Sequence, residues 1–332
     1  MQDMQQNSRR GGRQPKPPAS LPLAYPMDQA CSNGRVLLLG DIHANEVALQ
    51  AVASHAQAHH CNSTLFMGDI TGYGPHPIEC VRVLQGLSAN GGQWLAGNHD
   101  YGLLELKHVG ISGFVQSAHT QWVWDQHRTA LQKETALWTW LCDAVSLTRA
   151  DPLSIRLPDI NIAAVHANFS DFIGDNVYVN DILNIRENFR LAQNYFSSLS
   201  DTLCLLTAHT HMPCVLYTHD KNYKAWAQPI AIEYGRPISL QKEGAFWINI
   251  GSVGQPRDGD PRACYAVLDL DCLSITFYRV PYNYQKVQGL MQSLNYPAEF
   301  IRRLGDGRVD ATRIYEKVYV RREDGQALEV VI

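Results

Sequence analysis

Short apolar runs recur along the chain, and several of them end in a polar residue. Residues 36–39, 65–67 and 94–96 are apolar at every position, which is typical of buried parallel strands. Between the first two runs, Val47, Ala48, Ala51 and Val52 recur at helical spacing. This part of the chain therefore predicts β-turn-α units that share one sheet.

The second half of the chain has a different pattern. Apolar runs at 160–165, 203–207 and 246–248 predict further strands, with a helix at about 182–199. A hairpin follows, with arms at about 264–270 and 273–279, and helical spacing returns over 284–304. We expect an α/β fold in which two packed sheets are flanked by helices.

A third segment, from about 101 to 150, has helical spacing and is rich in tryptophan. It contains Trp122, Trp124, Trp138 and Trp140. Two interpretations stay open: a helical cap that buries aromatic side chains against the sheet, or a lid that shapes a substrate pocket.

The chain has 332 residues, 45% of them hydrophobic, and a formal net charge of -4. The first 32 residues lack the apolar side chains that a core requires and are predicted to be a disordered tail, which leaves one domain over 33–332. The absence of a basic excess argues against a stable nucleic-acid complex.

The expected location is the cytoplasm. The N-terminal segment has no apolar core of the kind that secretory signals carry, and no apolar stretch is long enough to cross a membrane. The eight cysteines form no C-x-x-C pair, so we expect buried free thiols rather than a zinc ribbon or redox motif.

The polar residues that follow the predicted strands are the candidates for chemistry. They are Asp41 and His43, Asp69, the trio Asn98, His99 and Asp100, His166, and the pair His209 and His211. Carboxyl ends of strands in an open α/β sheet meet at one edge, so these side chains are expected to lie together. Each residue alone would be an ordinary cap, turn or surface residue, and only the set indicates a site.

Oxygen and imidazole donors without cysteine suit Mn, Fe, Zn, Ni or Co. Two divalent ions about 3.5–4 Å apart need a bridging group, and the carboxylate of Asp69 can serve both. We expect Asp41, His43 and His211 to complete one ion, and Asn98, His166 and His209 to complete the other.

Such a centre would hold a hydroxide that attacks phosphorus. His99 could then protonate the leaving oxygen or contact the phosphate. Asp100 could fix the tautomer of His99, although an aspartate at this place is also a common helix N-cap.

At this point the chain resembles the calcineurin-like metallophosphoesterase superfamily. The family pattern D-x-H, G-D, G-N-H-[DE], a lone His and G-H-x-H is matched by residues 41–43, 68–69, 97–100, 166 and 208–211. Segments 72–75 and 251–257 are similar to the compact bacterial branch of small phosphodiesterases. The resemblance implies a four-layer αββα sandwich, a dinuclear centre and hydrolysis of phosphate esters.

Three positions depart from that pattern. Ala208 replaces a glycine, which adds a methyl group where the backbone turns. His166 is followed by Ala167-Asn168 rather than by a Gly-Ser-Pro type of turn, and His76 replaces a common acidic residue.

The leading function is a metal-dependent phosphodiesterase or phosphatase, with Tyr73, His76 and Arg257 as candidate substrate contacts. The expected partner is a phosphate ester, with a nucleotide among the options. The alternatives are a non-catalytic metal-binding scaffold, a serine/threonine protein phosphatase, and a nuclease, which the lack of basic excess disfavours. The native metal, the substrate and the oligomeric state stay open.

Overall fold

The computed structural model describes residues 34–89, 91–106, 117–147, 152–174, 182–193, 196, 202–220, 227–308, 318–321 and 327–330. The predicted tail over residues 1–32 lies outside these ranges.

The first sheet has six strands in the order β3-β2-β1-β11-β12-β9. Its parallel half contains β1 (Arg35–Leu39), β2 (Ser63–Met67) and β3 (Gly92–Leu95). Its antiparallel half contains β11 (Ala263–Asp269), β12 (Ser274–Val280) and β9 (Pro237–Ser239). The predicted hairpin is thus confirmed, and it extends the sheet that begins with the first apolar run.

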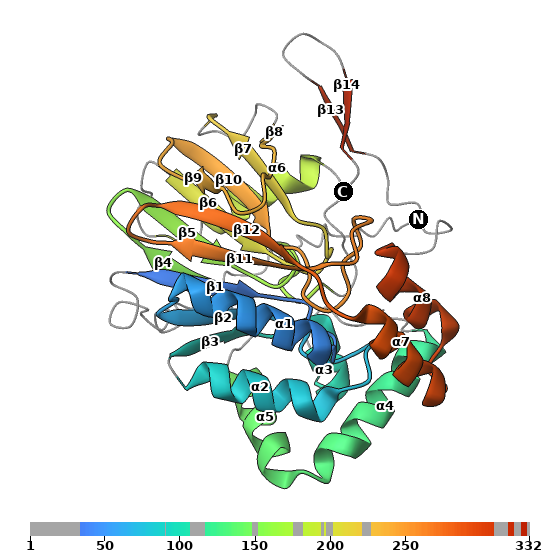
Figure 1. Ribbon diagram of the computed structural model, residues 1–332. Coiled ribbons are helices and arrows are strands. Elements are labelled where there is room, and N and C mark those ends of the chain that lie inside the picture. The colour runs from blue at the N-terminus through green and yellow to red at the C-terminus, as the bar shows by residue number, and fades with distance from the viewer. Residues whose placement is uncertain are drawn as a thin grey trace, which may run out of the picture.

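The second sheet also has six strands, in the order β4-β5-β6-β10-β7-β8. Its parallel centre contains β5 (Ile160–Ala164), β6 (Thr202–Thr207) and β10 (Gly244–Asn249). Antiparallel strands lie outside this centre, namely β4 (Leu153–Arg156), β7 (Cys214–Thr218) and β8 (Gln228–Pro229). A separate pair, β13 (Val318–Arg321) and β14 (Ala327–Val330), projects away from both sheets (Figure 1).

The two sheets pack face to face, and alternation along each strand builds the core between them. Val36 and Leu38 of β1 meet residues such as Leu206 and Ile248 of the second sheet there. Leu37 and Leu39 point the other way, onto the helices. Both faces of each central strand are therefore buried, which explains the continuous apolar runs.

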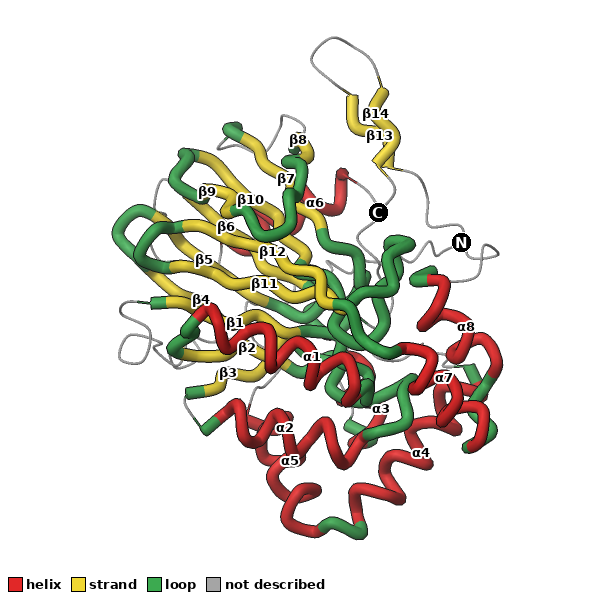
Figure 2. The backbone as a smooth tube through the Cα atoms, viewed as in Figure 1, coloured by secondary structure: helices red, strands yellow, loops and turns green. Residues whose placement is uncertain are grey.

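Helices form the outer layers (Figures 1 and 2). On the first sheet these are α1 (Glu46–Ala56), the short 3-10 helix η2 (Gln57–His59), α2 (Pro77–Ser88), α3 (Asn98–Leu104) and α5 (Thr135–Leu147). On the second sheet α6 (Ile182–Gln193) packs Ile185 and Phe189 against Leu205 and Trp247. The expected four-layer αββα sandwich of two mixed sheets is confirmed.

A separate apolar cluster joins distant parts of the chain. Val123 of α4 (Ala118–Gln132) packs with Val287 of α7 (Tyr284–Ser293) and with Phe300 and Leu304 of α8 (Ala298–Asp306). Of the tryptophan-rich segment, α4 therefore forms one helical layer with the C-terminal helices at the end of the sheets, whereas α5 packs on the first sheet (Figure 1).

The loops at the carboxyl ends of the strands are bonded to one another across the two sheets. Gly254 donates its N–H to the carbonyl of Asp41 at 2.9 Å, and Ala208 donates to the carbonyl of His166 at 2.8 Å. Asn45, the N-cap of α1, donates its side-chain amide to the carbonyl of Gly254 at 2.8 Å. This network makes the strand ends one connected unit.

A substitution at Gly254 tests whether the strand-end loops are tightly connected, because no side chain fits at this position. A Cβ atom there would collide with the carbonyl of Ile42, whereas a Cβ atom on Gly289, an exposed glycine of α7, would meet nothing. We expect Gly254→Ala to lower the free energy of unfolding by about 2 kcal/mol or more. Gly289→Ala should raise it by about 0.5–1 kcal/mol, as is usual for alanine in a helix.

Urea denaturation of both variants beside the parent protein measures the difference. Equal stability of the two variants would show that the strand-end loops are not tightly coupled.

Candidate metal centre

The loops after the strands bend sharply, and this brings the predicted ligands together. Asp41, His43, Asp69, His209 and His211 all have positive φ angles, between 47° and 65°. Non-glycine residues adopt this region at a cost of about 1–3 kcal/mol each, and such strain concentrates at functional sites. The backbone is therefore strained at five of the seven predicted ligands.

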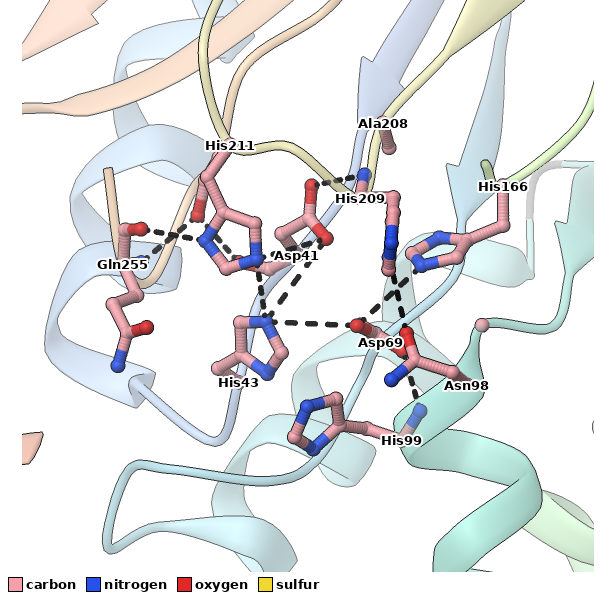
Figure 3. A network of polar contacts seen from close by, with 12 residues as sticks. Asp41, His43, Asp69, Asn98, His99, His166, Ala208, His209, His211 and Gln255 are labelled. Atoms are coloured by element: carbon pink, nitrogen blue, oxygen red, sulfur yellow. Dashed lines mark hydrogen bonds and ion pairs between the residues drawn. The ribbon is translucent and has the colours of Figure 1, made fainter. Parts of the chain in front are cut away.

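Asp69 lies at the centre of the cluster (Figure 3). One group of ligand atoms consists of Asp41, His43, Asp69 and His211, and all four atoms lie within 4.8 Å of one another. A second group of Asp69, His166 and His209 meets the same limit. Asp69 belongs to both groups, so the side chains could hold metal on two sides of one carboxylate.

The distances within the two groups are short. Asp69 Oδ2 lies 3.6 Å from His43 Nε2 and 3.4 Å from His166 Nε2, and Asp41 Oδ1 lies 3.4 Å from His211 Nε2. Asn98 joins the second group, since its Oδ1 lies 3.2 Å from His209 Nδ1. The structure thus brings all seven predicted ligands into one buried cluster.

Backbone carbonyls orient three of the imidazole rings. The Nδ1 atom of His43 lies 3.0 Å from the carbonyl of Thr71, that of His166 lies 2.6 Å from Met67, and that of His211 lies 2.6 Å from Gln255. A carbonyl can only accept, so each Nδ1 carries the proton and each Nε2 is left as an electron-pair donor toward the cluster. Metal-bound histidines are usually oriented by this type of contact.

Two buried atoms of the cluster support a cation at this place. Asp41 Oδ1 and His166 Nε2 have no hydrogen-bond partner among the described residues. Burial raises the pKa of Asp41 to about 8, and it lowers the pKa values of His43, His209 and His211 well below their ordinary range. His166 differs, because burial lowers its pKa but the carboxylates of Asp69 and Asp41 raise the pKa further, to about 9. Three neutral imidazoles and an Asp41 carboxylate that lacks a nearby positive charge fit a divalent metal, which would take the place of the proton on His166.

Comparison with known proteins agrees with this geometry. The sequence profile of the calcineurin-like phosphoesterases matches residues 34–239. The chain belongs to this family.

The structure of a metallophosphoesterase from Sphaerobacter thermophilus is similar at 30% identity, with a TM-score of 0.61, over 82% of this chain and 99% of that one. An uncharacterized protein of Methanocaldococcus jannaschii is 25% identical over 76% of this chain and 89% of its own length. A hypothetical protein of Pyrococcus horikoshii, 17% identical, shares the fold with a TM-score of 0.61 over 83% of this chain and 99% of that one. No helix among the described residues has the length and apolar character needed to cross a membrane.

In this phosphoesterase, Asp100 has different contacts from those expected. Its carboxylate accepts hydrogen bonds from the backbone N–H groups of Asp69, Ile70 and Gly97, at 2.8–3.0 Å. The prediction that Asp100 holds the ring of His99 is therefore wrong. Since Asp100 is at position N3 of α3, its oxygens face the strand-end loops, and it binds the backbone of Asp69 and Ile70 instead.

Trp124 of α4 makes the contact that was expected of Asp100. Its indole Nε1 donates to His99 Nδ1 at 3.1 Å. An indole N–H can only donate, so His99 Nδ1 accepts and the neutral ring carries its proton on Nε2. The ring of Trp124 also lies so close to Gly102 that no Cβ atom fits there. The tryptophan-rich segment thus reaches the site, although a lid function for it stays a prediction.

Two of the three predicted substrate contacts lie beside the cluster. The ring of Tyr73 is 4.6 Å from that of His43 and 4.5 Å from that of His99, centroid to centroid. Arg257 is buried, with its guanidinium 5.7 Å from the ring of Tyr73. His76 is the N-cap residue of α2, and its charged neighbours are Glu46, Glu79 and Lys286 rather than the cluster.

The departure at Ala208 is accommodated without strain. Positive φ angles fall on the neighbouring residues His209 and His211, not on Ala208. Its methyl group is fully buried in the core between the sheets. An alanine therefore fits this turn as readily as a glycine.

His127 is buried and hydrogen-bonded to the loop that carries Tyr73. Its Nδ1 accepts from the N–H of Gly72 at 3.3 Å, and its Nε2 lies 2.8 Å from the carbonyl of Gly74. Since a lone histidine in a helical segment carries no sequence signal of this kind, only the folded chain reveals the contact.

Replacing Trp124 by phenylalanine removes the donor and keeps most of the ring. We expect the ¹⁵N chemical shifts of His99 to report one tautomer, protonated at Nε2, in the parent protein and a mixture in Trp124→Phe. Trp122→Phe, two residues away on α4 and packed against Tyr296, is the matched control and should leave the tautomer unchanged. A mixed tautomer already present in the parent protein would contradict the assignment.

His127 should also make stability depend on pH. Burial lowers its pKa to about 3, so the folded protein keeps the ring neutral where the unfolded chain, with a pKa near 6.5, takes up a proton. The contribution of the neutral His127 ring to the free energy of unfolding is fully present above the pKa that His127 has in the unfolded chain. It declines as the pH falls from about 6.5 toward about 3. At one pH unit below 6.5, the free energy of unfolding has fallen by about 1.4 kcal/mol because of this residue.

Urea unfolding at about pH 7.5 and about pH 5.5 measures this loss. The variant His127→Gln has an amide that can both accept and donate a hydrogen bond and does not titrate in this range. Between the two pH values, its free energy of unfolding should therefore fall by about 1.4 kcal/mol less than that of the parent protein. His60→Asn, a change at an exposed histidine, should behave like the parent protein. Identical pH dependence in all three proteins would rule out His127 as the cause.

Proposed function

We propose that this protein hydrolyses phosphate esters with two divalent metal ions bound on either side of Asp69. The observation that carries the proposal is the membership of Asp69 in two groups of ligand atoms at once. Asp41, His43 and His211 would complete the first ion, and His166, His209 and Asn98 the second. Mn, Fe, Zn and Ni all suit such oxygen and imidazole donors.

When bound, the ions would lower the pKa of a water molecule and offset charge on the phosphate. Side chains of the protein would contact the leaving oxygen and the phosphate directly. The Nε2–H of His99 is available for the leaving oxygen, while Trp124 fixes the ring from its other side. Arg257 can donate two parallel hydrogen bonds to a phosphate, because a guanidinium matches that geometry.

Asp100 acts through the backbone rather than on the substrate. By accepting from Asp69 and Ile70, it holds the loop on which the shared carboxylate depends. His76 is less suited to contact the substrate than Tyr73 or Arg257, since its neighbours are charged residues near the start of α1 and α2. We retain Tyr73 and Arg257 as substrate contacts.

A non-catalytic metal-binding scaffold is the second candidate. It would need the ligands but not His99, and the contact between Trp124 and His99 favours an active site over a scaffold. A scaffold would have no need of a fixed imidazole tautomer beside the cluster.

The test is hydrolysis of bis-p-nitrophenyl phosphate and of p-nitrophenyl phosphate, with Mn²⁺ or with a chelator. We expect metal-dependent turnover and about two metal ions per chain. Asp69→Asn should lower both metal content and turnover by tenfold or more, on the order of the effects seen when metal-site groups are changed. His99→Ala should lower turnover about a hundredfold with metal content unchanged.

Asp143→Asn, a change at an exposed aspartate of α5, is the matched control and should keep both properties. A preference for the diester would identify a phosphodiesterase, and a preference for the monoester a phosphatase. Bound metal without turnover of either ester would favour the scaffold.

A further inference from the structure

Gln255 carries a buried hydrogen-bond donor that no described residue uses. The residue is 1% exposed, and its side-chain Nε2 has no hydrogen-bond partner among the described residues. An unpaired amide N–H is costly away from water, and most buried polar groups in folded proteins have a partner. A donor of this kind beside a candidate active site therefore indicates that a ligand supplies the acceptor.

The other polar atoms of Gln255 are engaged, and they fix its orientation. Arg257 donates from Nη2 to Oε1 of Gln255 at 3.1 Å, and because a guanidinium can only donate, this contact distinguishes Oε1 from Nε2. The backbone carbonyl accepts from His211 Nδ1 at 2.6 Å, and the backbone N–H donates to Ser252 Oγ at 2.9 Å. Figure 3 shows Gln255 at the His211 end of the cluster, opposite Asn98. None of these contacts uses Nε2.

Gln255 lines a narrow pocket that borders the cluster. The lining combines His43, Tyr73 and Gln255 with Met291 of α7 and with Phe300 and Leu304 of α8, and otherwise contains only glycine. His43 also belongs to the first group of ligand atoms. A group attached to a phosphate at the cluster can therefore enter this pocket directly beside His43.

The lining favours the organic part of an ester over a phosphate. Arg257 and Arg303 approach the ring of Tyr73 at 5.7 and 5.8 Å, but no arginine, lysine or carboxylate among the described residues lines the pocket. Apolar walls disfavour a charged group. The rings of Tyr73 and Phe300, 4.9 Å apart at an interplanar angle of 64°, offer faces and edges that suit a flat ring.

We propose that this pocket binds the organic part of the ester and that Nε2 of Gln255 donates a hydrogen bond to it. The preferred substrates are then esters whose organic part is a flat ring bearing a neutral acceptor, such as a carbonyl oxygen or a ring nitrogen. This inference rests on the proposed function, because the phosphate at the cluster sets the position of the organic part. An analogue without the acceptor leaves the donor unpaired and therefore binds less tightly.

The test compares ligands that differ in one acceptor and resist hydrolysis. They are the ortho, meta and para isomers of acetylbenzylphosphonate, each beside the ethylbenzylphosphonate with the same ring position. Their carbon–phosphorus bond makes binding measurable without turnover. Isothermal titration calorimetry on the full chain supplied with Mn²⁺ gives the dissociation constants, and the same samples are assayed with the two p-nitrophenyl esters.

Three variants isolate the donor. Gln255→Met removes the amide and keeps an unbranched side chain of similar length. Gln255→Glu keeps an acceptor for Arg257 and, when ionised, has no donor, so it separates the loss of Nε2 from the loss of the contact with Arg257. Gln292→Met, a change at an exposed glutamine of α7, is the matched control.

In the parent protein we expect at least one acetyl ligand to bind about tenfold more tightly than its ethyl counterpart, as one hydrogen bond to a buried donor allows. Gln255→Met and Gln255→Glu should each reduce this preference to about twofold or less. Gln292→Met should keep the preference of the parent protein. If Gln255→Met fails to fold, the preference measured for Gln255→Glu decides the question.

Equal binding of acetyl and ethyl ligands at all ring positions, or a preference that the Gln255 variants keep, would overturn the proposal. Equal weakening of both ligand types in these variants would also overturn it and leave Gln255 as a residue that only holds the loop. Turnover of the p-nitrophenyl esters without an acetyl preference would refute the role of the pocket and keep the proposed function. An acetyl preference that depends on Gln255, without turnover of either ester, would do the reverse.

Discussion

The burial of two carboxylates is the constraint on which the rest of the site depends. Asp41 and Asp69 are no more than 1% exposed and lie at the ends of neighbouring strands. Burial of an unpaired charge is strongly unfavourable, so each carboxylate needs compensation. Asp41 Oδ2 accepts from the N–H of His209 at 3.0 Å, and Asp69 Oδ1 accepts from the N–H of His99 at 2.8 Å. The remaining oxygens face imidazoles, which is the arrangement that a cation would complete.

The scaffold around these carboxylates is preorganised rather than flexible. The ligand loops have strained backbone angles, and hydrogen bonds between the loops of the two sheets hold them in that form. Ser252 contributes as well, because its hydroxyl donates to the carbonyl of Asp41 at 2.8 Å and accepts from the N–H of Gln255 at 2.9 Å. Strain of this kind persists only where the surroundings determine the geometry, and here both sheets do so.

The helical layer at the end of the sheets contacts the loops that carry the candidate ligands. Trp124 and His127 come from α4, and Arg303 comes from α8, yet all three contact the motif residues or the loop that carries Tyr73. The apolar cluster of Val123, Met291 and Phe300 fixes these two helices to each other. The helices that carry these side chains are thus held together by a core separate from the one between the two sheets.

The sequence by itself predicted two packed sheets flanked by helices, and it named the seven candidate ligands that the structure brings together around Asp69. Buried parallel strands have continuous apolar sequences. The polar residue after each of them lies at the carboxyl end of the strand, and these ends meet at one edge of the sheet. The peripheral strands β4, β7, β8 and β9 were not predicted, because short strands with mixed exposure have a weak apolar pattern. Only the tertiary structure decided that Trp124, and not Asp100, contacts His99, and that His127 and Arg303 contact the loop that carries Tyr73. These contacts join residues far apart in the chain through helix packing, whose geometry no local spacing encodes.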